Sequence, residues 1–166
     1  QGLSEAVQGF LGGVRDPSRQ TAGRLDNPLE GRRVLLVDDD VRNVYAMSAL
    51  LDEVGLIISS AKDGLEAIAC YAREPFDLIL MDMSMPTMDG YTATRILKTE
   101  HACSIPIIAL TAHAMKGDRE KCITAGADDY LAKPVTREVL LDMLMRWLPH
   151  APGAATAPPT PRATPR

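Results

Sequence analysis

The segment Asp77–Gly90, DLILMDMSMPTMDG, decides the fold of this chain of 166 residues. A run of apolar residues ends in Asp82, and a loop containing Pro, Asp and Gly follows, which predicts a buried strand over Asp77–Asp82 and then a sharp turn. The residue spacing over Gly90–Thr99 predicts a helix after the turn. A strand, a turn and a helix in this order are one unit of an alternating β/α fold.

The same unit recurs on both sides of this segment. Further apolar runs predict strands at Arg33–Val37, Leu56–Ala61, Pro106–Leu110 and Asp129–Ala132. Helical spacing and capping residues predict helices over Val41–Val54 and Thr136–Trp147. They also predict a helix that begins at the N-cap Asp63 and ends before Pro75, and one that follows the fourth strand and ends at Gly126. Apolar strands that alternate with helices predict a parallel sheet covered on both faces. The sequence therefore predicts one α/β domain over residues 32–148.

Two of the predicted helices have a distinct apolar pattern. The helix after Asp63 carries Leu65, Ile68, Ala69 and Ala72, and the last helix places Val139, Leu140, Met143, Leu144 and Trp147 on one side. Such spacing is typical of a helix with one buried side.

Composition and charge exclude several classes of function. The chain is 46% hydrophobic and 24% charged with a net charge of −4, which is ordinary for a globular domain and argues against nucleic acid as a partner. No apolar run is long enough to span a membrane, and the basic-then-apolar layout of a signal peptide is missing. We expect this segment to be cytoplasmic and to make no membrane contact itself, whether or not a parent protein is membrane-anchored.

The cysteines and histidines do not form a metal-binding pattern. The three cysteines contain no CxxC pair, and the three histidines are scattered. A disulfide framework and a thiolate or imidazole metal site are therefore not expected. If a metal binds, oxygen atoms must hold it.

The two ends of the chain differ from the predicted domain. Residues 1–31 are predicted to be a linker, and the Pro-, Ala- and Thr-rich residues 149–166 a disordered tail. Leu3, Val7, Phe10 and Leu11 have helical spacing. This pattern predicts a short helix, which is the last helix of an upstream domain, a linker helix or the remnant of another domain.

Polar residues directly follow most of the predicted strands. Asp38, Asp39 and Asp40 follow the first strand, Asp82 ends the third, and Thr111 and Lys133 follow the fourth and fifth. Taken singly, each has a structural explanation: an acid near a helix N-terminus, a helix cap or a surface lysine. In a parallel sheet, however, the carboxyl ends of the strands meet at one edge.

Carboxylates gathered at that edge would need a cation. Their pKa values would rise through mutual repulsion unless a positive charge lay among them, and one lysine is insufficient. A hard divalent ion with oxygen ligands fits best, and Mg²⁺ is the usual choice for carboxylate and phosphate sites. A carboxylate beside Mg²⁺, a lysine and a hydroxyl can carry out phosphoryl transfer, and Asp82 is the best nucleophile because it ends the central strand.

Four segments, VLLVDDD, DLILMDMSMPTMDG, PIIALTA and GADDYLAKP, resemble the receiver domains of two-component response regulators. The resemblance covers about residues 32–148. It implies a flavodoxin-like (βα)5 fold, a doubly wound parallel sheet of five strands in the order 2-1-3-4-5.

The resemblance also implies roles for single residues. Asp82 matches the phosphorylated aspartate, Asp39 the direct Mg²⁺ ligand and Asp38 the acid that holds Mg²⁺ through water. Ser84 matches the residue whose backbone carbonyl completes the metal shell, and Asp82 is itself a ligand.

Four further positions match residues that the family has around the phosphoryl group or in its switch. Thr111 matches the hydroxyl that bonds a phosphoryl oxygen, and Lys133 matches the lysine that pairs with it. Pro134 follows Lys133 where the family has a cis peptide bond. Tyr130 matches the aromatic residue that switches together with Thr111.

The resemblance implies a phosphohistidine donor on a histidine kinase or a histidine phosphotransfer domain. TAHAMKGDREKC is similar to receivers attached to hybrid sensor kinases, so we expect the C-terminal receiver of a hybrid histidine kinase. The alternative is a stand-alone single-domain response regulator that acts by protein binding. An aspartyl-phosphate hydrolase is disfavoured because Ser84 replaces the second acid of its DxD motif. The receiver itself would catalyse only its own phosphorylation and dephosphorylation.

Overall fold

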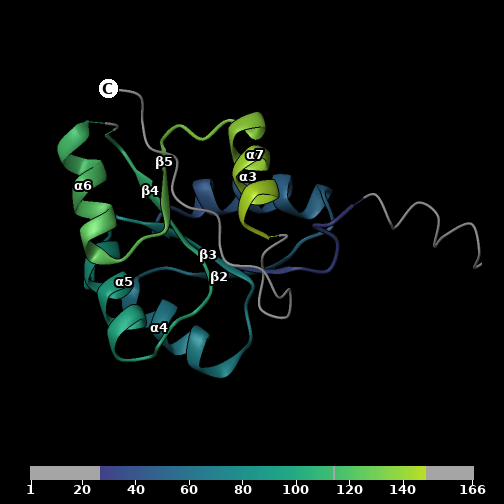
Figure 1. The fold of residues 1–166 in the computed structure, drawn as a ribbon. Coiled ribbons are helices and arrows are strands. Elements are labelled where there is room, and N and C mark those ends of the chain that lie inside the picture. The colour runs from purple at the N-terminus through teal and green to yellow at the C-terminus, as the bar shows by residue number, and fades with distance from the viewer. Residues whose placement is uncertain (1–26, 114, 149–166) are drawn as a thin grey trace, which may run out of the picture.

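Five parallel strands form one sheet in the order β2-β1-β3-β4-β5, which confirms the predicted topology (Figure 1). The computed structural model describes residues 27–113 and 115–148. The strands are β1 (Arg33–Val37), β2 (Ile57–Ala61), β3 (Leu78–Asp82), β4 (Ile107–Thr111) and β5 (Asp129–Ala132). The predicted strands differ from these by at most one residue at either end.

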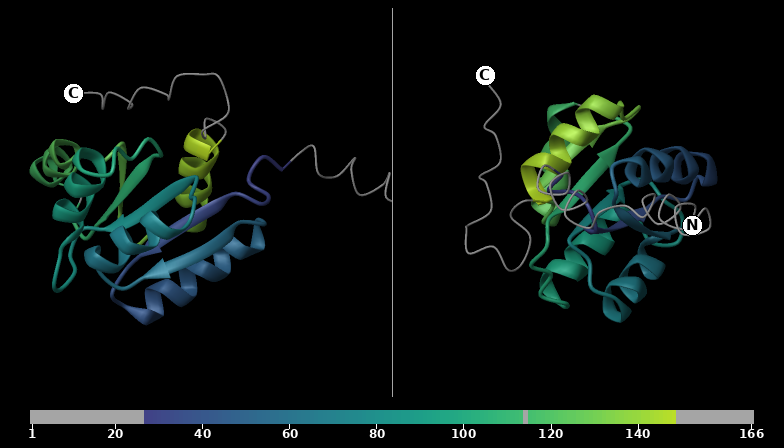
Figure 2. Two further views of the ribbon diagram at one scale, coloured as in Figure 1. Left: turned by 90° about the horizontal axis from the view of Figure 1, so that it is seen from below. Right: turned by 90° about the vertical axis from the view of Figure 1, so that its right-hand side faces the viewer.

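Helices cover both faces of the sheet. They are α3 (Val41–Glu53), α4 (Gly64–Arg73), α5 (Gly90–Thr99), α6 (Lys116–Ala125) and α7 (Arg137–Trp147). Helices α3 and α7 lie on one face, and α4, α5 and α6 lie on the other (Figure 2). Among the described residues, no helix combines the length and apolarity that a membrane crossing requires.

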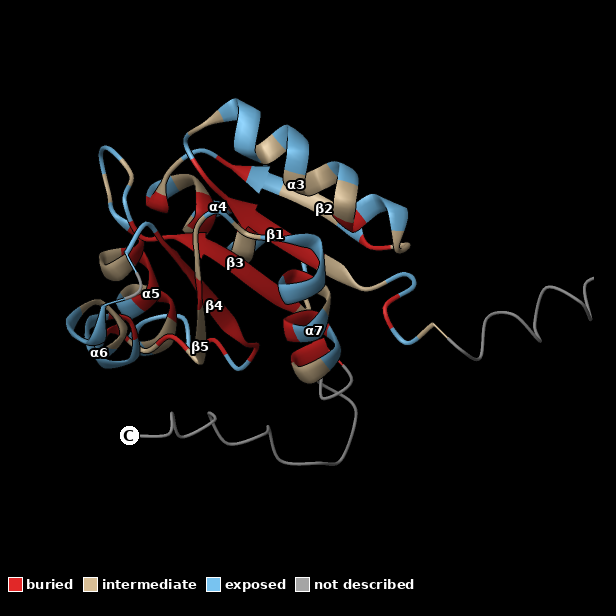
Figure 3. Cartoon of the chain, turned by 90° about the horizontal axis from the view of Figure 1, so that it is seen from above, coloured by how far each residue is buried: buried red, intermediate tan, exposed pale blue. Residues whose placement is uncertain are grey.

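Alternate residues of the central strands point into two separate cores. In β1, Leu35 and Val37 pack with α4 and α5, whereas Val34 and Leu36 pack with α3 and α7. All four side chains are at most 1% exposed, and the central strands are buried along their length (Figure 3). Burial of each such side chain contributes about 1.5–3 kcal/mol, which is why a continuous apolar run indicates a strand between two helical layers.

Polar side chains start four of the helices. Asp40, Asp63, Asp89 and Thr136 each accept a hydrogen bond from a backbone N–H two or three residues ahead. The predicted cap at Asp63 is confirmed, since its carboxylate accepts from the Glu66 N–H at 2.8 Å. Each cap satisfies a backbone donor that the helix leaves unpaired and is worth about 1 kcal/mol.

The buried side of α4 differs from its apolar pattern. The helix buries Gly64, Ala67 and Cys70, whereas Leu65 is 52% exposed. A Cβ added to Gly64 would lie 2.9 Å from the Ala93 Cβ of α5, so the two helices approach closely. Small residues therefore fill this contact, and the larger Leu65 faces solvent. In α7, Val139 is likewise 50% exposed although its predicted neighbours are buried.

Residues 27–31, predicted as linker, contact the body of the domain. Leu29 is 4% exposed in the core beside α3 and α7. The Asn27 amide donates to the Val54 carbonyl at 3.0 Å, and the Gly31 N–H donates to the Gly55 carbonyl at 2.8 Å. The structural unit thus includes these residues. The predicted helix of the first residues, the rest of the linker and the tail over residues 149–166 lie outside the described residues.

Candidate functional site

The parallel register brings the polar strand ends together. Val37 pairs with Met81, Asp82 with Leu110, and Thr111 with Ala132. Asp38, Asp82, Thr111 and Lys133 therefore follow one another along the carboxyl edge of the sheet, as expected for this fold.

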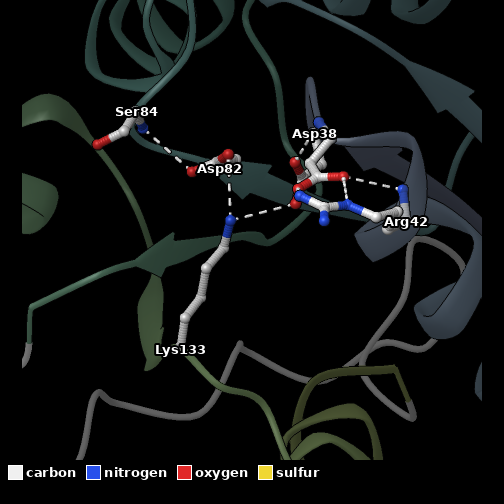
Figure 4. Close-up of polar contacts among 6 residues, drawn as sticks. Asp38, Arg42, Asp82, Ser84 and Lys133 are labelled. Carbon is white, nitrogen blue, oxygen red and sulfur yellow. Dashed lines mark hydrogen bonds and ion pairs between the residues drawn. The ribbon is translucent and has the colours of Figure 1, made fainter.

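Lys133 links the carboxylates of two different strands. Its Nζ lies 3.1 Å from Asp38 Oδ2 and 3.1 Å from Asp82 Oδ2 (Figure 4). The Asp38 and Asp82 side chains are only 1% and 5% exposed, and that of Lys133 is 23% exposed. A cis peptide bond joins Lys133 to Pro134, as the resemblance implied.

Three carboxylates at this edge form a set of oxygen donors. One oxygen each from Asp38, Asp39 and Asp82 lies within 4.8 Å of the other two. Asp39 is exposed, whereas Asp38 and Asp82 are buried. Hard oxygen donors with room for water suit Mg²⁺, so the residues present fit the ion that the sequence predicted.

Lys133 does not fully compensate the negative charge of the buried carboxylates in the site. Burial raises the pKa of Asp82, and the Ser84 N–H and the Lys133 ammonium oppose this rise without cancelling it. Burial alone would lower the pKa of Lys133, but the charges and hydrogen bonds of Asp82 and Asp38 raise it above its ordinary value. Lys133 therefore stays charged, and an ionised Asp82 is incompletely compensated by the protein alone.

The loop after β3 is held against Asp82. The Ser84 N–H donates to Asp82 Oδ1 at 3.1 Å, and the Met83 N–H donates to the Leu110 carbonyl at 2.9 Å. A Cβ on Gly90 would collide with the Asp82 carbonyl oxygen and lie 2.8 Å from Met83 Cα. Gly90 is thus required by this close approach. The MDG turn was visible in the sequence, but the contact itself was not.

Thr111 and Tyr130 lie near the site without touching the carboxylates. The buried Thr111 hydroxyl donates to the His113 carbonyl at 3.0 Å, and the Lys133 N–H donates to the Thr111 carbonyl at 2.7 Å. Tyr130 is half-buried against the core beside α4–α6, with the Arg119 guanidinium 5.6 Å from its ring centre. Their switching role stays a prediction.

The third aspartate of the loop has a different environment. Asp40 caps α3, and its carboxylate is bound by the backbone and side chain of Arg42. These hydrogen bonds hold the pKa of Asp40 below its ordinary value. The sequence prediction assigned no role to Arg42, although its place two residues after a helix-capping aspartate was visible.

A cavity of about 420 Å³ adjoins the site. It opens beside Asp38 and Lys133 and continues between α3 and the segment after β5. Its remaining lining residues include Asn43, Met47, Leu50, Ala112 and Val135. Lys133 therefore lines a cavity that is partly apolar.

Comparison with known proteins gives a consistent match. The family model described as the response regulator receiver domain matches residues 34–145. The sensor protein GacS of Pseudomonas syringae pv. syringae is 39% identical over 126 residues, which cover 72% of this chain and 14% of that protein. The chain thus spans a small part of this relative's length.

Solved structures of similar sequence have the same fold. The receiver domain of sensor histidine kinase PA1611 from Pseudomonas aeruginosa PAO1, with a magnesium ion coordinated in its active site cleft, is 44% identical. That match covers 71% of this chain and 98% of that one, with a TM-score of 0.66. The Saccharomyces cerevisiae co-crystal of the histidine phosphotransfer protein Ypd1 with the Ssk1 receiver domain contains a chain that is 27% identical, with a TM-score of 0.69. That match covers 72% of this chain and 90% of that one.

Proposed function

The chain belongs to the response regulator receiver domain family of two-component signalling, and from this premise we propose that it accepts a phosphoryl group on Asp82 in a Mg²⁺-dependent reaction. One observation carries the proposal. Lys133 Nζ lies 3.1 Å from the carboxylates of both Asp38 and Asp82 at the carboxyl edge of the sheet. This contact supports the roles proposed for Asp82 as the nucleophile, Asp38 as an acid of the metal site and Lys133 as the cation.

The donor in this proposal is a phosphohistidine. A carboxylate oxygen of Asp82 attacks phosphorus, the P–N bond to the imidazole breaks, and the imidazole leaves with the bonding electron pair. The product is an acyl phosphate on Asp82. Lys133, already in contact with Asp82, offsets the charge that develops on the phosphoryl oxygens.

The residues that would hold Mg²⁺ are those of the carboxylate set. Asp39 would bind directly, Asp38 through water, and Asp82 together with the Ser84 carbonyl would complete the protein ligands. When bound, Mg²⁺ supplies positive charge to the phosphoryl oxygens and relieves the repulsion between the carboxylates. Burial raises the pKa of Asp82 more than the Ser84 N–H and Lys133 lower it, so a further cation beside this carboxylate would favour its ionised form.

The response to phosphorylation would pass through Thr111. Its hydroxyl now donates to the His113 carbonyl at 3.0 Å, and we expect it to exchange this partner for a phosphoryl oxygen. Lys133 shares a backbone hydrogen bond with Thr111, so the two residues can move together with the start of the fifth β/α connection. Tyr130 is the aromatic residue proposed to follow this movement.

We infer a histidine kinase or a histidine phosphotransfer protein as the donor. The similarity to a sensor protein and to the receiver domain of a sensor histidine kinase supports a receiver within a hybrid kinase, acting on the cytoplasmic side. These matches favour that arrangement over a stand-alone response regulator. The proposed organisation is a receiver over residues 32–148, against which residues 27–31 pack, with the linker before them and a tail after residue 148.

The proposal is tested by incubating the chain with acetyl phosphate and with a phosphorylated histidine phosphotransfer domain. We expect one added, alkali-labile phosphoryl group by intact mass, formed with Mg²⁺ and suppressed when a chelator removes it. Equal labelling with and without the chelator would contradict the Mg²⁺ dependence. The absence of any alkali-labile adduct with either donor would contradict the proposed function.

A further inference from the structure

The acidic loop after β1 contains a carboxylate that is occupied by an arginine. Asp40 Oδ1 accepts hydrogen bonds from the Arg42 backbone N–H at 2.9 Å and from Arg42 Nε at 3.1 Å. Asp40 Oδ2 accepts from Arg42 Nη2 at 3.0 Å. Both carboxylate oxygens therefore have a donor from the same residue. The bidentate side-chain contact is the stronger and more specific form of this ion pair.

This pair is connected to the carboxylate set of the site. The Asp40 N–H donates to Asp38 Oδ1 at 2.9 Å, and Asp38 Oδ2 accepts from Lys133 at 3.1 Å. Figure 4 shows Lys133 in contact with both Asp38 and Asp82, and the contacts of Arg42 next to them. One hydrogen bond thus separates the Asp40–Arg42 pair from the proposed metal ligands.

The numbers of negative and positive side chains at this edge indicate how the Asp40–Arg42 pair can affect the site. The carboxylates at this edge outnumber the cations that contact them, Lys133 and Arg42. Without the arginine, the carboxylate of Asp40 would add a full negative charge next to Asp38 and Asp39. Asp40 Oδ2 would also lose its donor, while Oδ1 would keep the backbone N–H of residue 42.

We propose that Asp40 and Arg42 are a positioning pair that sets the affinity of the site for Mg²⁺. The inference rests on the proposed Mg²⁺ site. Arg42 keeps the Asp40 carboxylate turned toward the start of α3 and cancels its charge, while the Asp40 N–H fixes one oxygen of Asp38. Neither side chain needs to touch the phosphoryl donor.

Two substitutions separate this role from a purely structural one. Arg42→Gln removes the positive charge, and we expect the Kd for Mg²⁺ to fall by about threefold at low ionic strength. Asp40→Asn keeps an oxygen that can cap α3 and leaves Arg42 uncompensated, so the Kd should rise by about threefold. The double variant should return close to the wild-type Kd. A role as helix cap alone would weaken binding only in the variants of Asp40, because Arg42→Gln keeps the capped backbone N–H.

The experiment titrates MgCl₂ into the full chain by calorimetry. The measurement is made at low salt and at 1 M salt, where the screening length falls from about 30 Å to about 3 Å and the shifts should disappear. Arg73→Gln is the matched control, because Arg73 lies in the last turn of α4, at the opposite edge of the sheet. Thermal unfolding without Mg²⁺ checks that each variant is folded.

The outcomes distinguish the pair from the metal site itself. A wild-type chain that does not bind Mg²⁺ would reject the proposed metal site and the inference with it. A wild-type chain that binds, with Arg42→Gln and Asp40→Asn unchanged or shifted in the same direction, would overturn the pair alone. An equal shift in Arg73→Gln, or shifts that persist at 1 M salt, would also overturn it.

Discussion

At the residue scale, the site depends on where Lys133 places a single positive charge. Its Nζ lies 3.1 Å from a carboxylate oxygen of each of Asp38 and Asp82, both of which are buried. An ammonium group is compact and can lie between two acids, whereas a guanidinium is planar and needs a wider space. The shape of the cationic side chain at position 133 should therefore matter as much as its charge.

Lys133→Arg should impair phosphorylation although the charge is kept. The longer, planar side chain cannot occupy the same point between Asp38 and Asp82, so we expect the rate with acetyl phosphate to fall by about tenfold or more. The measurement is the rate of adduct formation by intact mass at saturating Mg²⁺. Lys121→Arg, on the exposed surface of α6, is the control and should leave the rate unchanged. A wild-type rate in Lys133→Arg would remove Lys133 from its proposed role.

The raised pKa of Asp82 predicts how stability depends on pH. An acid whose pKa is raised on folding binds its proton more tightly in the native state, so the stability it contributes at low pH is lost as the pH rises through the raised value. Asp82→Asn removes this titration. In metal-free buffer the free energy of unfolding of the variant should therefore increase relative to that of the wild type as the pH rises above about 4, the pKa of an unfolded aspartate.

Urea unfolding in the presence of a chelator measures this difference at each pH. Asp142→Asn is the control, because its side chain is 76% exposed and pairs with Arg146 in α7 and not with a residue of the site. Added Mg²⁺ should stabilise the wild type more than Asp82→Asn, since a ligand that binds only the native state raises its stability. If the difference in free energy of unfolding between Asp82→Asn and the wild type did not depend on pH, the raised pKa of Asp82 would be contradicted.

At the scale of the elements, the site depends on how closely the loop after β3 approaches the strand. Gly90 begins α5, and a Cβ there would collide with the Asp82 carbonyl oxygen. The start of α5 can therefore reach its place only without a side chain at this position. The backbone of the proposed phosphoacceptor and the first turn of this helix must move together.

Gly90→Ala should consequently destabilise the chain and slow phosphorylation. Forcing an extra methyl group into this contact is expected to lower the free energy of unfolding by about 1–3 kcal/mol. Gly117→Ala is the matched control: Gly117 lies in the first turn of α6, an added Cβ there meets no other segment within 4 Å, and alanine should not lower the free energy of unfolding. Urea unfolding and the labelling rate measure both effects. Equal stability changes in the two variants would contradict the close approach.

Helix α7 contacts β5 through a partly buried hydrogen bond between Trp147 and Asp129. Asp129 Oδ2 accepts from the indole Nε1 of Trp147 at 3.1 Å and lies 3.4 Å from Arg146 Nη1. Asp129→Ala leaves a buried indole N–H without its acceptor and should cost about 1–3 kcal/mol, whereas Asp129→Asn keeps an oxygen there and should cost less. Urea unfolding tests this order, with Asp52→Ala, an exposed residue of α3, as the control. A smaller loss in Asp129→Ala than in Asp129→Asn would contradict it.

At the scale of the whole molecule, the sequence predicted the topology and the edge where the site lies. Continuous apolar runs such as Arg33–Val37 mark strands buried on both faces, and this signal is local. Strand ends in a parallel sheet converge, so Asp38, Asp82 and Lys133 could be placed together before any contact was known. The roles of these residues in phosphoryl transfer stay predictions.

Features that depend on contacts between distant segments could not be predicted. The buried side of α4 follows from its close approach to α5, which Leu65 and its apolar neighbours do not reveal. Leu29 belongs to the core because it meets α3 and α7, although the residues around it have the composition of a linker. The Asp40–Arg42 contact requires knowledge of how the side chains lie, and spacing alone does not provide it.

The central claim is that Asp82 is the phosphoacceptor. The most direct test is intact-mass measurement of the wild type, Asp82→Asn and the control Asp142→Asn after incubation with a phosphohistidine donor and Mg²⁺. We predict one alkali-labile phosphoryl group on the wild type and on Asp142→Asn, and none on Asp82→Asn. Labelling of Asp82→Asn at the wild-type rate would contradict the assignment of Asp82.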